Sequence, residues 1–415
     1  YASLIESFPS SKRRRYRRAL VSLQSGPLTE RDAHISAFVK SEKLKIFQKD
    51  GDPRMIQARS VVFNLEFGMF TKSIEHSLYH LCDPKLEDLG IQVRMVAKGM
   101  NLKARARTMR LLWDLHNRPV ALSLDLSRWD MHVSVGMLGV MHAFYLSKIE
   151  HPMLKWLVSQ QIRNKAITSN RVRYQSTGGV MSGDMTTALG NCVAVLAILE
   201  GLRDLLCSLV DGLGRTIFAT VNTEETSDFQ TVIRIARTYL ANPEISRRMK
   251  PVPFMVLDDG DDHVMICEKE VAPMLEAILP VWWRLAGHEL KVEGVVEEFW
   301  QILFCQHKPH LTPEGWTMMP DPRKVLATST VVSGNDVKNP GPYLKTVWEA
   351  RYQLHWNLPV LGPLFKNLSR SVKGVKGLSG LKRARVLSGV DILLLQNQGD
   401  LRVENRQPTV QQRMM

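Results

Sequence analysis

Strict alternation of apolar and polar positions marks one strand of the chain. In Val120–Leu126 (VALSLDL), every second residue is Val or Leu, and the residues between them are Ala121, Ser123 and Asp125. Side chains two positions apart point to the same face of a strand. The pattern therefore predicts a half-buried strand that carries Asp125 near its end, on the less apolar face.

A second apolar pattern predicts a β-hairpin. The runs Phe254–Leu257 and His263–Cys267 are apolar, and they flank the acidic segment DDGDD. Gly260 lies in the middle of that segment and can adopt the positive φ that a tight turn requires. The carboxylates of Asp258, Asp259, Asp261 and Asp262 are therefore expected at the tip of the hairpin.

Apolar side chains recur at steps of three and four residues between Ser182 and Leu206. They are Met185, Leu189, Cys192, Leu196 and Leu199. This period is that of an α-helix, and Ser182 is a suitable N-cap residue for it. Asp184, Thr187 and Asn191 follow the same spacing, so we expect them to form one polar stripe on a mostly buried helix.

Composition adds a basic charge to this picture. The chain has 415 residues, of which 44% are hydrophobic and 23% charged, as in globular proteins. Its net charge is +14, which favours a polyanionic partner, either a nucleic acid or an acidic membrane surface. Basic runs at Lys12–Arg18, Lys98–Arg110 and Lys366–Arg385 favour RNA, although each alone is equally typical of a solvated face or a mobile tail.

The cysteines and the apolar runs exclude other classes of protein. The five cysteines are scattered without zinc-site spacing, so we expect reduced thiols in a cytosolic setting. Tyr1–Arg18 lacks the apolar run of a signal peptide, and the longest nearly apolar stretch, Ala188–Leu199, is too short to cross a bilayer. The sequence therefore predicts no transmembrane segment in this chain.

The crowded carboxylates of the predicted turn favour a metal site. Like charges this close raise one another's pKa unless a cation compensates, and Mg²⁺ is a hard cation that takes oxygen ligands. Asp125 could join Asp261 to hold two ions about 3.5–4 Å apart, as in phosphoryl transfer. An acidic, solvent-exposed hairpin turn without a metal is the alternative, and for DDGDD alone it is the commoner one.

The polar stripe on the predicted helix indicates what the site could bind. A site built to pair a ribose 2′-OH rejects the deoxy analogue, because its own polar groups would stay unsatisfied. Asp130 follows Asp125 by five residues and is a natural partner for Asn191 in that role. The alternative is that the stripe faces water or bonds to helix carbonyls.

These segments together resemble a known family. The order LSLDLSRWDMHVS, STGGVMSGDMTTALGN, LDDGDDHVM and FCQHKPH resembles palm motifs A, B, C and E of viral RNA-dependent RNA polymerases, most closely the tombusvirus-like group. Upstream, FVKSEKL and DPRMIQARS resemble finger motif F. The resemblance covers roughly residues 38–310. Thr186 departs from the Asn that many tombusvirus-like enzymes have there, which leaves the subgroup open.

The resemblance implies a role for each matching residue. Asp125, Asp261 and Asp262 would be catalytic metal ligands for Mg²⁺, with Mn²⁺ able to substitute. Asp130, Ser182, Thr187 and Asn191 would read the ribose, and Lys40, Lys43, Arg54 and Arg59 would hold the triphosphate of the incoming nucleotide. Lys291 would be the general acid for the leaving pyrophosphate. A solvated basic loop and a surface lysine are the respective alternatives for the motif F residues and for Lys291.

The resemblance also implies an α+β, right-hand polymerase fold with an antiparallel-sheet palm. The expected parts are a basic N-terminal segment (1–35), fingers with motif F (36–118), palm motif A (119–146), fingers again (147–174), palm motifs B, C, D and E (175–311), and a thumb with a basic C-terminal segment (312–415). Phe304–Gln306 would form a strand that supports the primer's 3′ end, or a plain core strand. Trp348, Tyr352, His355 and Trp356 would either pack the thumb or support a first nucleotide in unprimed initiation.

The activity implied is RNA-templated RNA synthesis from NTPs, for replication and transcription of a positive-strand RNA virus genome. The implied partners are RNA template and product, NTPs, and other viral replication proteins or a membrane-anchored replication complex. The implied location is the host cell cytoplasm, at membrane-associated replication sites. A reverse transcriptase and an inactive RNA-binding scaffold are the alternatives. Asp130 with Asn191 argues against the first, and the retained carboxylates argue against the second.

Overall fold

The structure is a computed structural model that describes residues 1–8, 10–40, 54–210, 227–332, 338–379 and 387. The chain forms two compact units. The first unit comprises Tyr1–Phe8, Lys12–Val96 and Leu112–Glu297, and the second comprises Pro9–Ser11, Ala97–Leu111 and the chain from Glu298 onward. The second unit thus includes residues 97–111, which the sequence assigned to the fingers. Its last segment begins at Glu298, 14 residues before the expected start of the thumb at 312.

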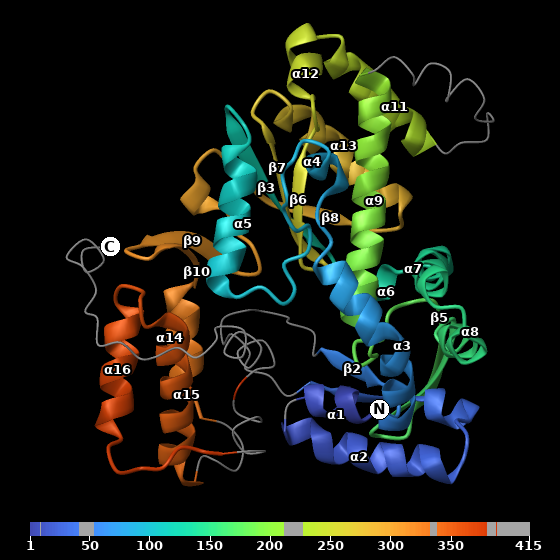
Figure 1. Ribbon diagram of the computed structural model, residues 1–415, viewed down its shortest axis with the longest axis vertical. Coiled ribbons are helices and arrows are strands. Elements are labelled where there is room, and N and C mark those ends of the chain that lie inside the picture. Colours follow the sequence, from blue (N-terminus) through green and yellow to red (C-terminus); the bar gives the residue numbers. More distant parts are fainter. Residues whose placement is uncertain (9, 41–53, 211–226, 333–337, 380–386, 388–415) are drawn as a thin grey trace. The chain divides into compact units, whose positions relative to one another are not determined.

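The described elements of the two units are shown in Figure 1. The first unit contains α1 (Ala2–Ser7), most of α2 (Ser10–Ser25), η1 (Glu30–Ala33), β1 (Ile35–Val39), β2 (Met55–Ala58), α3 (Val61–Tyr79), α4 (Pro84–Glu87), β3 (Pro119–Leu126), α6 (Trp129–His132), α7 (Val135–Lys148), α8 (Pro152–Ser159), β4 (Arg163–Thr168), β5 (Arg173–Thr177), α9 (Thr187–Val210), α11 (Ser227–Leu240), α12 (Pro243–Arg248), β6 (Met255–Asp258), β7 (Asp262–Glu268), α13 (Ala272–Leu285) and β8 (Leu290–Val296). The second contains most of α5 (Leu102–Asp114), η2 (Phe299–Gln301), β9 (His307–Thr312), β10 (Gly315–Pro320), α14 (Pro322–Thr330), α15 (Pro340–His355) and α16 (Leu361–Ser371).

A four-stranded sheet forms the centre of the first unit, in the order β6-β7-β3-β8. All its strand pairs are antiparallel, and α9 and α13 pack beside it (Figure 1). The predicted strand and hairpin are both confirmed. However, β3 is buried on both faces up to Asp125, because Ala121 and Ser123 are covered as well as the Leu residues. The prediction of a half-buried strand was therefore wrong in this respect.

A second sheet in this unit has the order β2-β1-β4-β5. Its pairs are antiparallel except β1 with β4, which run parallel. One face of this sheet is closed by Ile35, Ala37, Ala166 and Met181. Met181 lies just before α9, so this sheet contacts the segment that leads into that helix.

The helix predicted from Ser182 begins instead at Thr187, as α9. Gly183 explains the difference. Its amide donates to the Gln57 carbonyl at 2.8 Å, and a Cβ at this position would lie 2.7 Å from Cα and Cβ of Ala58. The segment 182–186 is therefore packed against β2 rather than wound into the helix, since tertiary contact outweighs the local apolar period. Ser182 is not the N-cap.

The second unit has its own small core. Tyr343, Val347 and Trp348 of α15 pack with Leu361 and Phe365. The predicted strand at Phe304–Gln306 was wrong, because Cys305 and Gln306 have positive φ values of 49° and 61° and form a turn before β9. A buried aromatic side chain at Phe304, 2% exposed, had the same apolar signature as a core strand.

Part of the basic run Lys98–Arg110 is used inside the second unit. Lys103 forms an ion pair with Glu314 at 3.2 Å. The Arg110 guanidinium lies 5.1 Å from the Phe299 ring centre and 5.8 Å from that of Trp316, within the range of a cation–π interaction. These side chains therefore stabilise the unit, and they contribute less to a free basic surface than the sequence indicated.

Trp348 is a core residue rather than a surface ring for a first nucleotide. It is 8% exposed, and its Nε1 donates to the Ser329 carbonyl at 3.0 Å. We expect Trp348→Ala to lower the free energy of unfolding by about 3–5 kcal/mol, because it leaves a cavity and an unpaired carbonyl. Urea unfolding followed by circular dichroism measures this. Trp300→Ala is the control, since Trp300 is 55% exposed, and equal losses for both would contradict the assignment.

The five cysteines are all free thiols. Among the helices that the structure describes, none combines the length and the hydropathy needed to traverse a lipid bilayer.

Candidate active site

The acidic turn between β6 and β7 has a fixed backbone. The Asp259 amide donates to the Asp262 carbonyl at 2.9 Å, and the Gly260 amide donates to Asp258 Oδ1 at 3.0 Å. Gly260 has a φ of 92°, which an L side chain rarely adopts. Asp258 is fully buried, whereas Asp261 is exposed at the tip. The turn therefore presents Asp261 and uses Asp258 to hold its own shape.

Register in the central sheet brings the other predicted residues to this turn. Asp125 of β3 is directly opposite Asp262 of β7 and directly opposite Lys291 of β8. Cβ atoms of residues paired this way are about 4.5–5.5 Å apart. A carboxylate from β3, the carboxylates of the turn and one lysine thus come from three adjacent strands to one end of the sheet.

The carboxyl groups at this end repel one another. Burial, and then the charges of Asp261 and Asp125, raise the pKa of Asp262 to about 7. Burial also raises the pKa of Asp130 to about 6, although a hydrogen bond from Asn191 lowers it. Groups with such raised pKa values in one place are typical of functional sites. A bound cation would relieve the repulsion.

The donor set fits a hard divalent cation that substrate also helps to hold. Among the residues that the structure describes, no three His, Cys, Asp or Glu side chains already converge on one point as a metal cage. Mg²⁺ commonly takes only one or two carboxylates and completes its shell with water and substrate phosphates. Asp125, Asp261 and Asp262 would supply those carboxylates, so an open site of this kind fits Mg²⁺ better than a closed structural one.

We expect Mg²⁺ to bind more tightly as the pH rises from about 6 to about 8, since Asp262 must lose its proton before it can hold a cation. Below its pKa of about 7, each pH unit should weaken the apparent affinity by up to about tenfold, and above it the affinity should level off. Isothermal titration calorimetry at constant ionic strength measures this. Asp262→Asn should remove the pH step, and equal affinity at both pH values would contradict the assignment.

The raised pKa of Asp262 lowers the free energy of unfolding as the pH rises, whereas the rise in pH strengthens the expected Mg²⁺ binding. Because Asp262 keeps its proton to a higher pH when folded than when unfolded, its favourable contribution is complete below the unfolded pKa of about 4. That contribution is lost as the pH rises through about 7. Thermal shifts caused by Mg²⁺ must therefore be compared with the metal-free protein at each pH.

Asp130 and Asn191 meet beside this end of the sheet. Asn191 lies on α9 and Asp130 on α6, and Asn191 Nδ2 donates to Asp130 Oδ1 at 3.5 Å. Asn191 is 6% exposed, and its Oδ1 has no hydrogen-bond partner within the described part of the chain. A buried acceptor without a partner is unfavourable. This amide is therefore ready to accept a hydrogen bond from a ligand hydroxyl.

The other two residues predicted to read the ribose have partners in the protein. The Thr187 hydroxyl donates to the Met181 carbonyl at 2.7 Å. Ser182 is exposed, and its Oγ accepts from the Gln57 amide at 3.2 Å. The Thr187 hydroxyl therefore bonds to a carbonyl that precedes α9, and not to a carbonyl of the helix itself. Both hydroxyls hold the segment before α9 in shape.

Arg59 and Asp184 do not lie where the sequence predicted. Asp184 precedes α9, so it is not part of a stripe on that helix. It forms a buried ion pair with Arg59, whose Nε lies 2.9 Å from Asp184 Oδ1, and both side chains are 1% exposed. The Arg59 guanidinium therefore faces the protein interior in this conformation, and its contact with the triphosphate stays a prediction.

The other cationic residues predicted for the site are Arg54, Lys40 and Lys43 of motif F, and Lys291. Arg54 is exposed and close enough to Asp130 for its charge to lower the pKa of that carboxyl, so a cation does lie near the Asp130–Asn191 pair. The Lys40 amide donates to the Arg54 carbonyl at 2.8 Å. Lys40 follows β1 and Arg54 precedes β2, so this bond extends the pairing of the two strands by one residue. Lys43 lies outside the described residues. Lys291 is exposed on β8.

Sequence reasoning missed an aromatic cluster beneath the acidic turn. The rings of Trp129 and His288 stack with centres 4.0 Å apart, and Trp283 contacts both His263 and His288. Burial lowers the pKa of His263 and of His288 to about 4, so both are neutral near pH 7. The only signal in the sequence is that Trp129 and His263 directly adjoin the acidic candidates Asp130 and Asp262, and this alone does not predict stacking.

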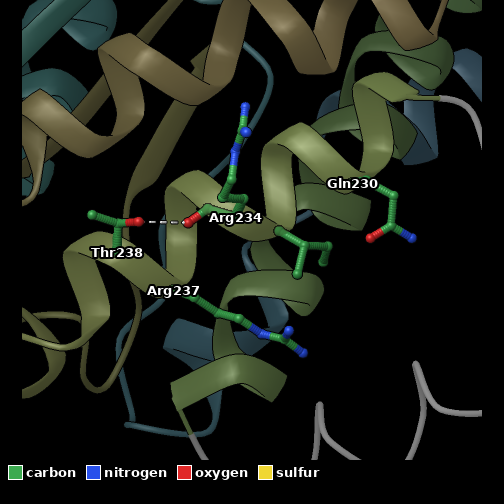
Figure 2. A pocket seen from close by; sticks show the side chains of 5 residues that line it. Gln230, Arg234, Arg237 and Thr238 are labelled. Atoms are coloured by element: carbon green, nitrogen blue, oxygen red, sulfur yellow. Dashed lines mark hydrogen bonds between the residues drawn. The ribbon is translucent and has the colours of Figure 1, made fainter.

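A pocket elsewhere in this unit is unrelated to the acidic turn. Its lining consists of Gln230, Ile233, Arg234, Arg237 and Thr238, all from α11. Figure 2 shows the Arg234 and Arg237 side chains pointing in different directions, so they do not converge on one anion. Thr238 is bonded to the Arg234 carbonyl of its own helix. This pocket is not a candidate for the predicted chemistry.

Comparisons with known proteins agree with the geometry. A family described as viral RNA dependent RNA polymerase matches residues 2–206 and 238–414. The chain is 30% identical over 369 residues to the RNA-directed RNA polymerase of Tobacco necrosis virus (strain A), covering 87% of this chain and 44% of that protein. It is 28% identical over 396 residues to that of Melon necrotic spot virus, covering 93% and 43%. For Turnip crinkle virus the identity is 28% over 383 residues, covering 90% and 43%.

The chain thus spans less than half the length of these curated relatives. The family match nevertheless covers most of the chain and includes every predicted site residue. It leaves out residues 207–237, which include most of the α11 pocket. With its acidic turn, paired carboxylates and matching family model, this chain belongs to the viral RNA-dependent RNA polymerase family.

Proposed function

We propose that this chain is the polymerase core that copies an RNA template into RNA, joining NTPs to an RNA 3′-OH. The observation that carries the proposal is the register Asp125 with Asp262 in the central sheet, together with the Asp130–Asn191 pair beside it. The first supplies carboxylates for phosphoryl transfer, and the second supplies groups that distinguish a ribose from a deoxyribose.

In this proposal each residue has a chemical role. Asp125, Asp261 and Asp262 hold Mg²⁺, for which Mn²⁺ can substitute, and the bound ions would stabilise charge on the attacking and leaving oxygens. The RNA 3′-OH gives up its proton to solvent, its oxygen attacks the α-phosphorus of the NTP, and the bond to pyrophosphate breaks. Lys291, exposed opposite Asp125, gives a proton to that leaving group.

The nucleotide is held by groups around the same end of the sheet. Arg54 is suited to the triphosphate, since a guanidinium can pair two phosphate oxygens at once. Lys40 and Lys43 are proposed to assist it. Asn191 accepts the ribose 2′-OH at its unpartnered Oδ1, and Asp130 orients the Asn191 amide. This set selects NTPs over dNTPs, as expected for an RNA polymerase and not for a reverse transcriptase.

We further propose the right-hand arrangement for this mixed helix and sheet protein. The antiparallel sheet β6-β7-β3-β8 is the palm, and the sheet β2-β1-β4-β5 belongs to the fingers. The helices α14, α15 and α16 of the second unit are the thumb. The Lys and Arg side chains that give the chain its net charge of +14 would contact the phosphates of the RNA backbone. RNA binding should therefore weaken steeply with added salt.

Membership of the family supports a proposal for the biological setting. The proposed process is replication and transcription of a positive-strand RNA virus genome in the host cell cytoplasm, at membrane-associated replication sites. Other viral replication proteins or a membrane-anchored replication complex would be the partners.

The test is incorporation of labelled NTPs on a defined RNA template, with and without a primer. Synthesis should require Mg²⁺ or Mn²⁺ and stop when a chelator removes it. ATP should be used in preference to dATP. Template-independent addition, or a preference for dATP, would overturn the proposal.

A further inference from the structure

A buried ion pair connects the fingers sheet to the segment that leads into α9. Arg59 follows β2, and its Nε lies 2.9 and 3.0 Å from the two carboxylate oxygens of Asp184. Gln161 Nε2 donates to the same carboxylate at 2.9 Å and to the Thr186 hydroxyl at 3.0 Å. The carboxylate therefore receives one cation and one amide in a site closed to water, where such contacts are strong.

The rest of the Arg59 guanidinium is also engaged. Nη1 donates to the Ala33 carbonyl at 2.5 Å, and Nη2 donates to the Asn164 side chain. Asn164 in turn donates to the Gly178 carbonyl at 3.1 Å. These partners come from the chain before β1, from β4 and from the end of β5. A single guanidinium thus joins Asp184 directly to η1 and β4, and through Asn164 to Gly178 just after β5.

The position of residues 182–186 is fixed by contacts on both sides. Asn64 of α3 donates to the Gly183 carbonyl at 3.2 Å and accepts from the Met185 amide at 2.9 Å. Gly183 has no room for a side chain against Ala58. Because α9 begins directly after this segment, with Thr187, a shift at Asp184 moves the first turns of the helix, and Asn191 lies there.

We propose that Asp184 and Arg59 are positioning residues for the ribose-reading amide of Asn191. Arg59 would act through its ion pair with Asp184, and not by holding the triphosphate of the nucleotide. This inference rests on the proposed function, because it gives a task to residues that touch neither nucleotide nor metal.

The test is a double-mutant cycle with ATP and dATP incorporation as the readout. Arg59→Gln and Asp184→Asn each leave one buried charge without its partner, so each should lower the ATP-over-dATP ratio of kcat/KM by about tenfold or more. The double variant removes both charges and keeps two amides in hydrogen-bond reach. Its ratio should return to within about threefold of the original.

The competing assignment of Arg59 predicts a different result. If Arg59 held the triphosphate, Arg59→Gln would raise KM for ATP and dATP alike, because uniform binding would be lost. Adding Asp184→Asn would then restore nothing. A double variant that is no better than Arg59→Gln therefore overturns the inference.

The chain offers a matched control in a second buried ion pair. Arg203 Nη1 lies 2.6 Å from Asp83 Oδ2, with side chains 0% and 3% exposed, and it lies more than three helical turns beyond Asn191 on α9. Arg203 also pairs with Glu200 at 2.6 Å, so Asp83→Asn should reduce stability less than Asp184→Asn does, and it should leave the ATP-over-dATP ratio unchanged. If Asp83→Asn lowers the ratio as much as Asp184→Asn does, the effect is general destabilisation and the inference fails.

Two further measurements cover poor folding and absent activity. Thr186→Val removes only the hydroxyl that Gln161 contacts, so it should fold and lower the ratio by a smaller factor, about threefold. Hydrogen exchange of the amides of residues 183–187 should speed up in Asp184→Asn, recover in the double variant and stay unchanged in Asp83→Asn. If the exchange rates do not differ in this way, the inference is overturned, even where the chain synthesises no RNA. A lack of RNA synthesis would by itself count only against the proposed function.

Discussion

Asp261→Asn is expected to lower NTP incorporation on an RNA template by at least about a thousandfold, with RNA binding largely unchanged. Asp261 is exposed at the tip of a turn whose shape is held by Asp258 and Gly260, so the substitution should leave the fold intact. It removes a negative charge from a ligand to the proposed Mg²⁺. Single-nucleotide extension measures the chemistry, and filter binding of labelled RNA measures the affinity.

Asp259→Asn is the matched control, since it removes the same charge from the same turn at a residue without an assigned metal contact. It should keep at least about a tenth of the activity. Retained synthesis in Asp261→Asn would contradict the catalytic assignment, whereas an absence of synthesis in the unchanged chain would favour an RNA-binding scaffold. Equal losses in both variants would show that the charge of the whole turn matters, and not a ligand at Asp261.

Asn191→Ala is expected to reduce the preference for ATP over dATP by about a hundredfold or more. The Oδ1 of Asn191 has no hydrogen-bond partner among the described residues and would accept the 2′-OH, a contact that a deoxynucleotide cannot make. Most of the change should appear as slower use of ATP and little change for dATP. Competition between the two nucleotides at a single templated position gives the ratio directly.

Asn242→Ala is the control for this prediction. Asn242 caps α12 by accepting from the Glu244 amide at 2.9 Å, so its loss costs stability and does not touch the proposed nucleotide site. Its nucleotide preference should equal that of the unchanged chain. If Asn191→Ala keeps the full preference for ATP, the ribose is read by other groups and the assignment of the Asp130–Asn191 pair is wrong.

The sequence by itself determined the strands and the carboxylates at their ends. Alternation in VALSLDL and the apolar runs around DDGDD are local signals, because the strand period of two is set by the backbone alone. The prediction of β3, β6 and β7 followed from them. The motif order also fixed the family, since several short segments in one order are far more specific than any one of them.

Register and burial required the tertiary structure. Nothing local to β3 states that Asp125 pairs with Asp262 on one side and Lys291 on the other. The raised pKa of Asp262, about 7, exists only because burial and several carboxylates meet there. Likewise, the stacking of Trp129 on His288 joins residues more than 150 positions apart.

The segment before α9 shows most clearly why the sequence was insufficient. Its apolar period favoured a helix from Ser182, and a basic motif favoured a phosphate contact for Arg59. The fold instead packs Gly183 against Ala58 and closes Arg59 onto Asp184. The reason is physical: a charged side chain is buried only where a partner charge from elsewhere in the chain meets it, and such a meeting is decided by tertiary packing.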